Sequence, residues 1–454
     1  MKSPPVTCYS SHMHSSHTKQ LFAAHIARLQ ACYADALGQL PGAEGMLLYS
    51  GTEQVYYADD QAVSFRAYGH FCHWLPVNRP DQAILVTPGR RPVYFQVVPP
   101  DYWYDQSIVN ASWWADEFDI VTLNSIEQIR PCLRNPDRLA FLGEPDSLAM
   151  TIGIEPQYLN PRVLLNNLDF ARARKTPYEI EQIRSANRLA LQGHAAGRQT
   201  FLDGGSEYAI HMAYLQACQL TDPECPYTSI VALDEKAAIL HYQHKRRHRP
   251  RDGEGQVLLI DAGHKVNNYC SDITRTTVRP GCNELFSQLL AGMEAIEERL
   301  VAAVRPGISY LDIHRSAMQQ IAALGIDLGL ISCNVEEALA LNLPGLFMPH
   351  GVGHLLGLQV HDVGGHLCSA DGEASPPPAE YPFLRNTRTL VPDMVFTIEP
   401  GFYFIPLLLD AERDTPRGRH LNWRLIDPLI PFGGIRVEDN VRVTADAVEN
   451  LTRQ

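Results

Sequence analysis

Apolar residues follow a helical spacing near the start of the chain and then gather in short runs. In residues 18–40 they recur at three- and four-residue steps, which is typical of an amphipathic helix. The pair Pro41-Gly42 is a stop signal for that helix. Short apolar runs predict strands at 46–49, 83–86 and 93–98, so residues 45–165 are expected to form an α/β domain.

The pattern changes near residue 170, where a domain boundary is predicted. Thr176, Pro177 and Glu179 form a capping box with proline at the first helical position, which marks the start of a long helix. Roughly the last hundred residues, rich in glycine and proline, read as strands and loops. Further elements are predicted as helices at 206–220, 283–304 and 309–325 and as strands at 227–231 and 257–260.

The expected fold is therefore α/β (α+β), with a mixed α/β domain over 1–170 and a second domain over 171–454. The net charge of −13 makes the chain a poor candidate for binding nucleic acid, which requires clustered basic residues. One basic run, 245–249, is flanked by proline and glycine and is interpreted as a solvated loop.

The ten cysteines are scattered and include no Cys-x-x-Cys pair, which favours reduced thiols and a cytoplasmic location. No apolar run approaches the roughly 20 residues needed to cross a bilayer, and no signal peptide is recognised. His12, His14 and His17 could bind a metal weakly, but a frayed tail is the favoured interpretation because termini are usually disordered.

Two aspartates are placed to face each other at the end of a buried strand. Asp261 ends the apolar run that begins at Val257, and Asp272 follows eleven residues later, after a predicted turn. A hairpin would bring the two carboxylates to neighbouring positions on paired strands. Because buried carboxylates repel each other unless a proton or a cation lies between them, the pair points to a divalent metal.

A glycine-rich segment, residues 349–365, carries three histidines. His350, His354 and His361 lie among glycines that allow close approach of the backbone. A single histidine in such a place is most often a packed core residue, but three of them in a chain with paired acids favour a functional site.

Glu399 and Glu438 are each predicted to lie inside an apolar strand, where an unpaired carboxylate would be costly. Together with the two aspartates and one imidazole they form an oxygen-rich ligand set that suits Mn²⁺, Co²⁺ or Zn²⁺. Two such metals could share a bridging hydroxide and polarise a carbonyl. The alternative, in which the acids are surface ion pairs and the histidines pack, requires several independent accidents of burial.

At these residues the sequence resembles the pita-bread metallopeptidases, and most closely the bacterial Xaa-Pro dipeptidases. The resemblance covers nearly the whole chain and includes 101–103 and 227–233. It is specific to this subfamily at 381–385 and 431–436. It implies that 171–454 forms a pita-bread domain with a curved antiparallel sheet, and that the protein hydrolyses Xaa-Pro dipeptides.

The resemblance also implies a role for each ligand. Asp261 would bind one metal through both oxygens, while Asp272 and Glu438 would bridge both metals. His354 and Glu399 would complete the coordination of the second metal, and Glu399 would act as general base and then acid. The cofactors would be two divalent ions, usually Mn²⁺ with Co²⁺ or Zn²⁺ as alternatives, that hold a bridging hydroxide.

Arginines are expected to recognise the dipeptide. Arg385 would pair with the substrate carboxylate, because a guanidinium grips it with two hydrogen bonds. Arg388 is the alternative clamp. Arg436 would orient the metal-binding acids or contact substrate, and a purely structural ion pair is equally compatible. The imidazoles expected to line the scissile bond are those of His241, His350 and His361.

A homodimer is implied, in which the first domain limits substrate length. Asp59 and Asp60 lie in a polar stretch, and one of them is expected to meet the free amino group of a substrate across the dimer; a solvated turn is the alternative. An aminopeptidase acting on longer Xaa-Pro peptides is the nearest alternative activity, and hydrolysis of organophosphate triesters is implied as a side reaction. A pita-bread binding module without activity is a further alternative. Such a module would have lost metal ligands, and this sequence retains all five.

Overall fold

The computed structural model describes residues 16–106, 112–144 and 146–453. The chain divides into two compact units between Leu168 and Asp169. Of the histidines near the N-terminus, His12 and His14 lie outside the described residues, and His17 is an exposed residue of the first helix.

The N-terminal unit is built on a five-stranded mixed sheet. Its strands are β1 (Gly45–Tyr49), β2 (Ala83–Val86), β3 (Val93–Val97), β4 (Asp119–Leu123) and β5 (Leu139–Leu142), in the order β4-β3-β2-β1-β5. The β1–β2 and β2–β3 pairs are antiparallel, whereas β3–β4 and β1–β5 are parallel. The three strands predicted here are therefore present.

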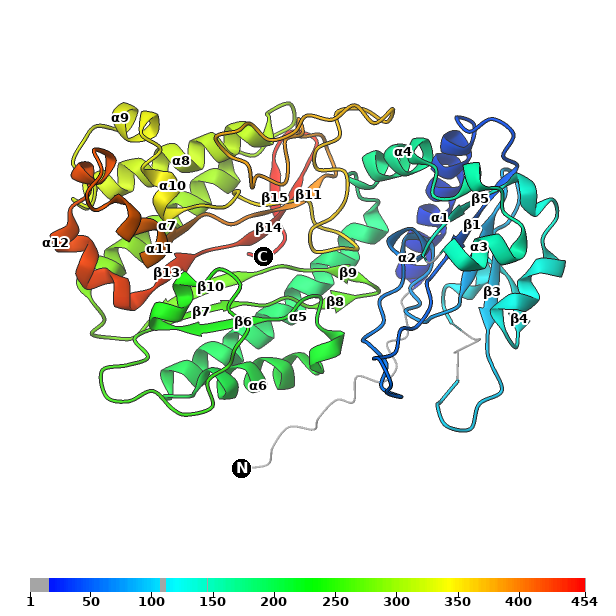
Figure 1. The fold of residues 1–454 in the computed structure, drawn as a ribbon, viewed down its shortest axis with the longest axis horizontal. Coiled ribbons are helices and arrows are strands. Elements are labelled where there is room, and N and C mark those ends of the chain that lie inside the picture. The colour runs from blue at the N-terminus through cyan, green and yellow to red at the C-terminus, as the bar shows by residue number, and fades with distance from the viewer. Residues whose placement is uncertain (1–15, 107–111, 145, 454) are drawn as a thin grey trace. The chain divides into compact units, whose positions relative to one another are not determined.

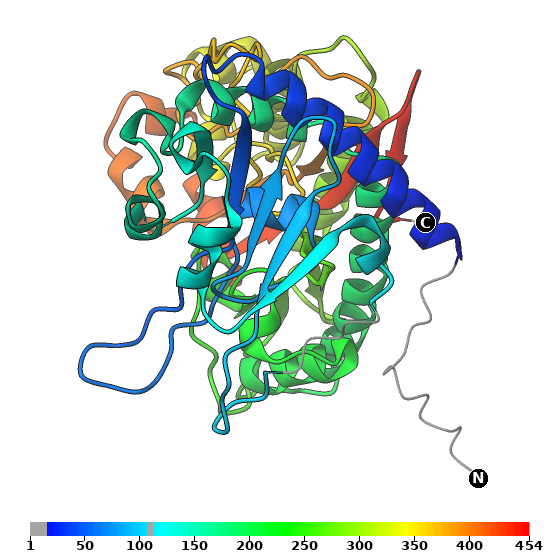
Figure 2. The same ribbon diagram turned by 90° about the vertical axis from the view of Figure 1, so that its right-hand side faces the viewer.

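The helix predicted at 18–40 is α1 (Ser16–Leu37), which runs beside this sheet (Figure 2). It buries Phe22, Ile26 and Leu29, the apolar positions that gave the helical spacing. The other α-helices of this part of the chain are α2 (Gly69–Trp74), α3 (Asp146–Ile152) and α4 (Arg162–Arg172). Short 3₁₀ helices lie at Ala115–Glu117, Ile126–Cys132, Pro136–Arg138 and Pro156–Tyr158.

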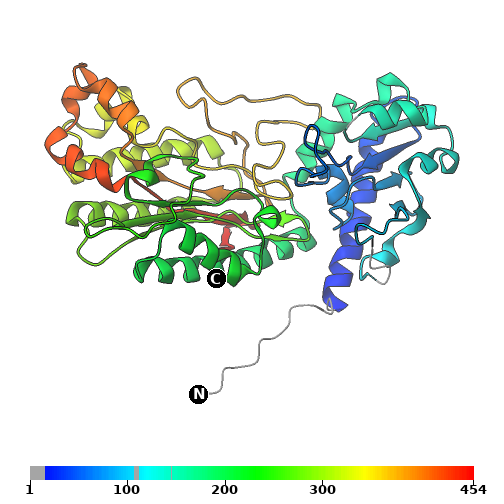
Figure 3. The ribbon, with the colours of Figure 1, turned by 60° about the horizontal axis from the view of Figure 1, so that its bottom comes forward.

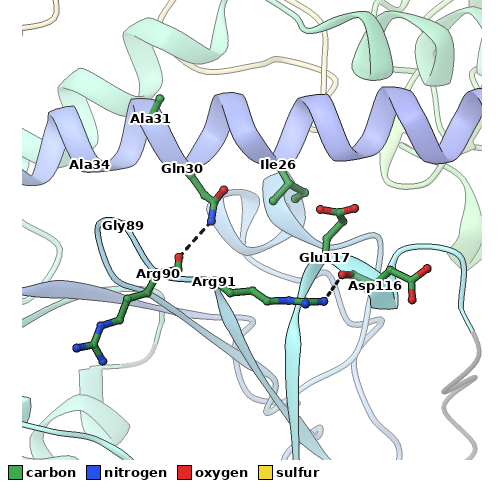
Figure 4. Close-up of a pocket in the computed structure, with 9 residues that line it drawn as sticks. All are labelled: Ile26, Gln30, Ala31, Ala34, Gly89, Arg90, Arg91, Asp116 and Glu117. Atoms are coloured by element: carbon green, nitrogen blue, oxygen red, sulfur yellow. Dashed lines mark hydrogen bonds between the residues drawn. The ribbon is translucent and has the colours of Figure 1, made fainter.

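A pocket of about 580 Å³ lies between α1 and the turn that joins β2 to β3 (Figure 4). Gln30 Nε2 donates to the Arg90 carbonyl at 3.1 Å, and Arg91 donates to the Asp116 carbonyl. The pocket lining contains none of the residues predicted to bind metal or substrate, so the predicted chemistry does not lie here.

The C-terminal unit is built from antiparallel strand pairs (Figure 1). Its strands are β6 (Ile230–Leu233), β7 (Val257–Asp261), β8 (Lys265–Val266), β9 (Tyr269–Cys270), β10 (Thr274–Val278), β11 (Val395–Ile398), β12 (Gly401–Tyr403), β13 (Gly434–Arg436), β14 (Asp439–Val443) and β15 (Val448–Asn450). They form the sheets β10-β7-β6 and β11-β14-β15 and the pairs β12-β13 and β8-β9. Every strand pairing described in this unit is antiparallel, and the predicted fold class is confirmed.

Two pairs of helices pack against these strands (Figure 3). The helices α5 (Pro177–Leu202) and α6 (Glu207–Cys218) cover β6 and β7, where Ile210 shares a buried cluster with Leu258 and Ile260. The helices α7 (Glu284–Ala303) and α8 (Tyr310–Asp327) share the main core with β11 and β14. The predicted capping box starts α5: Glu179 Oε2 accepts from Thr176 N at 2.7 Å.

The end of the chain contains more helix than predicted. The α-helices α11 (Pro406–Leu409) and α12 (Trp423–Ile426) alternate with 3₁₀ helices at Asp410–Glu412, Arg417–His420 and Asp427–Phe432. The prediction of strands and loops alone was wrong because proline is tolerated in the first turn of a helix, where no intrahelical donor is needed. Two further short helices are α9 (Val335–Ala340) and α10 (Pro344–Phe347).

The basic run at 245–249 is only partly solvated. Arg246 donates through Nε to Glu207 Oε1 at 3.2 Å, and that carboxylate is fully buried. Lys245 Nζ donates to the Ser229 carbonyl at 3.0 Å. The solvated-loop prediction is therefore wrong for these two residues, because a buried acid on α6 anchors the loop.

None of the described helices combines the length and the apolar character that crossing a membrane would require.

Candidate metal and catalytic site

A single cavity of about 480 Å³ in the C-terminal unit is lined by ten of the residues predicted to bind metal or substrate. Two further candidates, Asp59 and Asp60, belong to the N-terminal unit. The ten that line the cavity are Asp261, Asp272, His354, Glu399, Glu438, His241, His350, His361, Arg385 and Arg436.

The two aspartates are brought together by the predicted hairpin. Asp261 is the last residue of β7 and pairs with Thr274 of β10, and Asp272 lies just before that strand. The short strands β8 and β9 form the connection. The hydroxyl of Tyr227 lies 2.7 Å from Asp261 Oδ1 and 2.5 Å from Asp272 Oδ1, so it holds the two carboxylates close together.

The two glutamates lie at strand ends and not inside strands as predicted. Glu399 lies in the break between β11 and β12, and Glu438 lies in the break between β13 and β14. Because β11 pairs with β14 and β12 with β13, the two breaks are neighbours, and Val437 N donates to the Pro400 carbonyl at 3.3 Å. Pro400 has no N–H to donate to a ladder, which is the physical reason for the break after Glu399.

The ring of His354 is oriented by the backbone. Its Nδ1 lies 3.0 Å from the Leu355 carbonyl, so Nδ1 carries the proton and Nε2 faces the acids. Nε2 lies 3.3 Å from Asp272 Oδ2 and 3.6 Å from Glu399 Oε1. The neighbouring Gly353 is required by close packing, since a Cβ there would lie 2.3 Å from the Thr397 carbonyl oxygen. This arrangement leaves Nε2 available as a metal ligand.

The acids crowd one another electrostatically. Burial, together with the repulsion of nearby carboxylates, raises the pKa of Glu438 well above its ordinary value, and burial raises the pKa of Glu399 to about 7. Burial also raises the pKa of Asp261, against the charge of Arg436. For Asp272 burial is outweighed by the hydrogen bond and charge of His354, which lower its pKa.

Such a cluster fits a cation. Ligand atoms of Asp272, His354 and Glu438 all lie within 4.8 Å of one another, and all three residues are buried. Carboxylates that would otherwise take up protons can instead be neutralised by divalent metal ions, which prefer this mixture of oxygen and imidazole donors.

Arg436 is held by protein groups through all three nitrogens. Nε donates to Thr274 Oγ1 at 3.0 Å, the first terminal nitrogen donates to the Tyr403 hydroxyl at 2.9 Å, and the second donates to Asp261 Oδ2 at 2.5 Å. Thr274 Oγ1 in turn donates to Glu438 Oε2 at 2.7 Å. The geometry therefore suits orientation of the acids better than direct contact with substrate.

The three candidate histidines other than His354 differ in their surroundings. His350 Nδ1 lies 2.7 Å from the Gly351 carbonyl, and its Nε2 lies 3.0 Å from the Tyr403 hydroxyl, so both nitrogens are engaged. Burial lowers the pKa of His350 to about 3 and keeps the ring neutral. His361 and His241 are exposed at the cavity, and the His361 ring packs edge-on against His354 with centroids 4.3 Å apart.

The two candidate carboxylate clamps occupy different places. Arg385 is exposed, lines the cavity and makes no ion pair with the described residues. Arg388 is buried, stacks on Phe170 at 4.0 Å and donates to the Phe170 carbonyl at 3.1 Å. Arg388 is not among the residues that line the cavity, so this alternative is disfavoured.

Asp59 lies in an exposed turn of the N-terminal unit. Its Oδ1 accepts from the backbone N–H groups of Asp60 at 2.7 Å and Gln61 at 3.3 Å. Asp60 is exposed as well.

Several polar groups of the site were missed in the sequence. Tyr227, Tyr403 and Thr274 link the acids to one another and to Arg436. His366 also lines the cavity, and its Nε2 lies 2.9 Å from the Leu384 carbonyl. The signals for Tyr227 were its position at the start of a predicted strand and its place in a segment covered by the resemblance, and an aromatic residue there is more often part of a core.

Comparison with known proteins agrees with this geometry. The family model described as "Metallopeptidase family M24" matches residues 181–445, and the model described as "Xaa-Pro dipeptidase, N-terminal domain" matches residues 20–170. The chain belongs to metallopeptidase family M24. It is therefore a metal-dependent peptidase, and the resemblance drawn from the sequence is confirmed.

Curated relatives within the family match over almost their full length. A Xaa-Pro dipeptidase of Marinobacter nauticus is 43% identical over 95% of this chain and 97% of its own. A Xaa-Pro dipeptidase of Aeromonas hydrophila is 40% identical over 96% of this chain and 98% of its own.

Solved structures support the fold of this M24 member. Aminopeptidase P from E. coli with the inhibitor Pro-Leu superposes with a TM-score of 0.72 at 23% identity, covering 96% of this chain and 95% of that one. Proline aminopeptidase P II from Yersinia pestis superposes with a TM-score of 0.71 at 22% identity, covering 96% of this chain and 96% of that one. At this identity the likeness establishes a shared pita-bread fold alone.

Proposed function

We propose that this M24 peptidase hydrolyses Xaa-Pro dipeptides with two divalent metal ions. The observation that carries the proposal is the cavity in which four carboxylates and the Nε2 of His354 converge. Relatives named Xaa-Pro dipeptidase, 38–43% identical over nearly the whole chain, support the substrate class. The ligands would be Asp261, Asp272, His354, Glu399 and Glu438.

The donor set favours Mn²⁺, with Co²⁺ or Zn²⁺ as alternatives, because four of the five ligands are carboxylates. Bound metals would supply an activated hydroxide between them and would polarise the scissile carbonyl. Arg436, Tyr227 and Thr274 keep the acids in place through hydrogen bonds from neutral or cationic donors. These contacts fix the ligand geometry before substrate binds.

Glu399 is the carboxylate best placed to move a proton. Its side chain is 16% exposed, against 12% for Asp261 and 7% for Asp272, so it lies nearest the open part of the cavity. It would accept the proton from the attacking water and deliver it to the proline nitrogen.

Substrate contacts are assigned to exposed groups at the cavity. Arg385 would pair with the dipeptide carboxylate, because its guanidinium has no carboxylate partner among the described residues. His241 and His361 would contact the scissile peptide and the product. The ring of His350 is neutral and hydrogen-bonded to the Tyr403 hydroxyl. Because Arg436 also donates to that hydroxyl, His350 would support the position of Arg436 and would add no charge to the site.

The remaining parts of the proposal concern the N-terminal unit. It would contribute to a homodimer and to the selection of short substrates. Asp59 or Asp60 of the partner subunit would contact the free amino group of the dipeptide. The alternative of an aminopeptidase for longer peptides is not favoured. The relatives of high identity are Xaa-Pro dipeptidases, whereas the aminopeptidase P structures support only the fold.

Hydrolysis of Ala-Pro and of Ala-Pro-Ala by the Mn²⁺-loaded protein tests the substrate class. The expected result is cleavage of Ala-Pro and little cleavage of the tripeptide. Equal or faster cleavage of Ala-Pro-Ala would overturn the dipeptidase assignment while keeping the metallopeptidase chemistry.

Replacement of Arg385 by alanine tests the carboxylate clamp. Loss of a hydrogen bond to a charged group costs about 1.5–3 kcal/mol, so kcat/KM for Ala-Pro is expected to fall roughly 10- to 150-fold. Most of the change should appear in KM. The exposed Arg198, on α5, provides the control, and Arg198→Ala should leave the kinetics unchanged. Equal kinetics for both variants would refute the clamp.

A further inference from the structure

A second group of metal-ligating side chains lies apart from the catalytic cavity. The Cys333 thiol, a Glu337 carboxylate oxygen and a His420 ring nitrogen all lie within 4.8 Å of one another. Cys333 and His420 are half-buried, and Glu337 is exposed. The residues that line the catalytic cavity are different ones.

The backbone holds Cys333 and His420 side by side. Ser332 N donates to the His420 carbonyl at 2.9 Å, and Ser332 Oγ lies 3.1 Å from the same oxygen. The adjoining residues Ile331 and Leu421 form an antiparallel bridge and are 2% and 4% exposed. Cys333 lies two residues from the buried Ile331, and His420 lies directly beside the buried Leu421, so this bridge anchors the backbone of both ligands.

Glu337 is fixed by the start of α9. Asn334, directly after Cys333, caps this helix by accepting from Glu337 N at 2.9 Å. The cap places the first helical turn, and hence the carboxylate, against the thiol. In Figure 1, α9 lies in the same region as the segment between α11 and α12 that carries His420.

The three side chains have no other partner within the described part of the chain. Cys333 is a free thiol. Glu337 and His420 make no side-chain hydrogen bond or ion pair with described residues, although other charged residues of the region do, as in the Arg417–Glu412 pair at 3.4 Å. The ligand atoms thus converge on one another without any internal contact that accounts for their arrangement.

We propose that Cys333, Glu337 and His420 form a zinc-type metal site with an open fourth position. Thiolate and imidazole ligands select Zn²⁺ over the harder Mn²⁺, and three protein ligands with one water complete a tetrahedral site. The site ties α9 to the segment 417–421. It goes beyond the proposed hydrolysis and does not rest on it.

Cobalt serves as the probe for this site. A thiolate bound to Co²⁺ gives a sulfur-to-metal charge-transfer absorption in the near ultraviolet, and the catalytic ligand set contains no sulfur. The full-length protein is first loaded with Mn²⁺ and then titrated with Co²⁺. The expected result is a charge-transfer band that grows with added Co²⁺ and then saturates, and Co²⁺ that exchanges into the catalytic site adds nothing to it.

Three variants decide the assignment. The band should disappear in Cys333→Ser and persist in Cys368→Ser, a control at an exposed cysteine of the same unit. Loss of a group that only hydrogen-bonds to a metal ligand lowers metal affinity about 10- to 100-fold. Loss of a ligand itself should cost at least as much, so the affinity of Glu337→Gln for Co²⁺ should fall at least about tenfold. Cys333→Ser should keep its Ala-Pro hydrolysis, which also shows that it folds.

A titration without a charge-transfer band, or a band of equal strength in Cys333→Ser, would overturn the site. Unchanged affinity in Glu337→Gln would remove the carboxylate from the ligand set and overturn the proposal as stated. Because the band is read without substrate, failure of the hydrolysis assay would count against the proposed peptidase function and leave this test intact.

Discussion

Replacement of Asp362 by asparagine tests how a buried ion pair supports the cavity. The Asp362 carboxylate is 2% exposed and lies 2.7 Å from the Arg172 guanidinium and 3.0 Å from Lys175 Nζ. Both cations precede α5, and Asp362 directly follows His361. The ion pair therefore fastens the histidine-bearing segment to the start of the catalytic unit.

The size of the effect follows from burial. Asp362→Asn keeps the shape of the side chain but leaves the Lys175 ammonium, which is 1% exposed, without its carboxylate. Breaking a buried pair by removing one partner costs about 3–5 kcal/mol. The pair of Asp427 with Arg413, at 2.7 Å, is 49% and 37% exposed, so Asp427→Asn should cost only about 0–1 kcal/mol.

The pH dependence of the effect has a defined sign. Burial raises the pKa of Asp362, but the charges of Arg172 and Lys175 outweigh it and lower the pKa below its ordinary value. A lowered folded-state pKa contributes stability above the unfolded value, about 3.9, and loses it as the pH falls through the folded value. The difference in stability between wild type and Asp362→Asn should therefore shrink below about pH 4.

Urea denaturation of wild type, Asp362→Asn and Asp427→Asn at pH 7, and again at acidic pH, measures these differences. A loss at pH 7 for Asp362→Asn that is no larger than the loss for Asp427→Asn would refute the reasoning. So would a loss that grows as the pH falls below 4.

Other predictions concern the site and the N-terminal unit. Tyr227→Phe removes the hydroxyl shared by the two aspartates and should weaken Mn²⁺ binding about 10- to 100-fold; an unchanged affinity by calorimetry would contradict this role. Tyr403→Phe leaves a buried guanidinium nitrogen without its acceptor and should lower the free energy of unfolding by about 1–3 kcal/mol, measured by denaturation. Of Asp59→Asn and Asp60→Asn, at least one should raise KM for Ala-Pro, and unchanged KM and kcat in both would refute contact with the substrate amine. The organophosphate side reaction implied by the resemblance should appear as phosphotriester hydrolysis that stops on chelation, and its absence from the Mn²⁺-loaded protein would count against it.

Elements with a strong apolar pattern were predictable from the sequence. The strand expected at 83–86 is β2, and the helix expected at 283–304 is α7 (Glu284–Ala303). In both segments the side chains that create the pattern are the ones that become buried, so local spacing and tertiary packing agree. The helices between 406 and 432 were not predictable in this way, because they are only three to six residues long and two of them, Pro406–Leu409 and Asp427–Phe432, carry proline in the first turn.

The acids and histidines of the site were also visible in the sequence, because charged groups stand out among apolar and glycine neighbours. Their gathering in one cavity required the pairing of strands distant in sequence, such as β11 with β14. The supporting hydroxyls were not visible. Tyr403 lies in the aromatic run 402–404, which reads as core, and only the structure shows its hydroxyl between Arg436 and His350.

Metal content and Ala-Pro hydrolysis, measured together on a chelated sample as Mn²⁺ is returned, test the central claim most directly. Mn²⁺ is the ion of choice because its preference for oxygen ligands directs it to the carboxylate site. The proposed site predicts that activity is lost on exhaustive chelation and is restored in full as two Mn²⁺ ions bind per chain. Activity that survives chelation, or that returns in full with one ion per chain, would contradict the two-metal site.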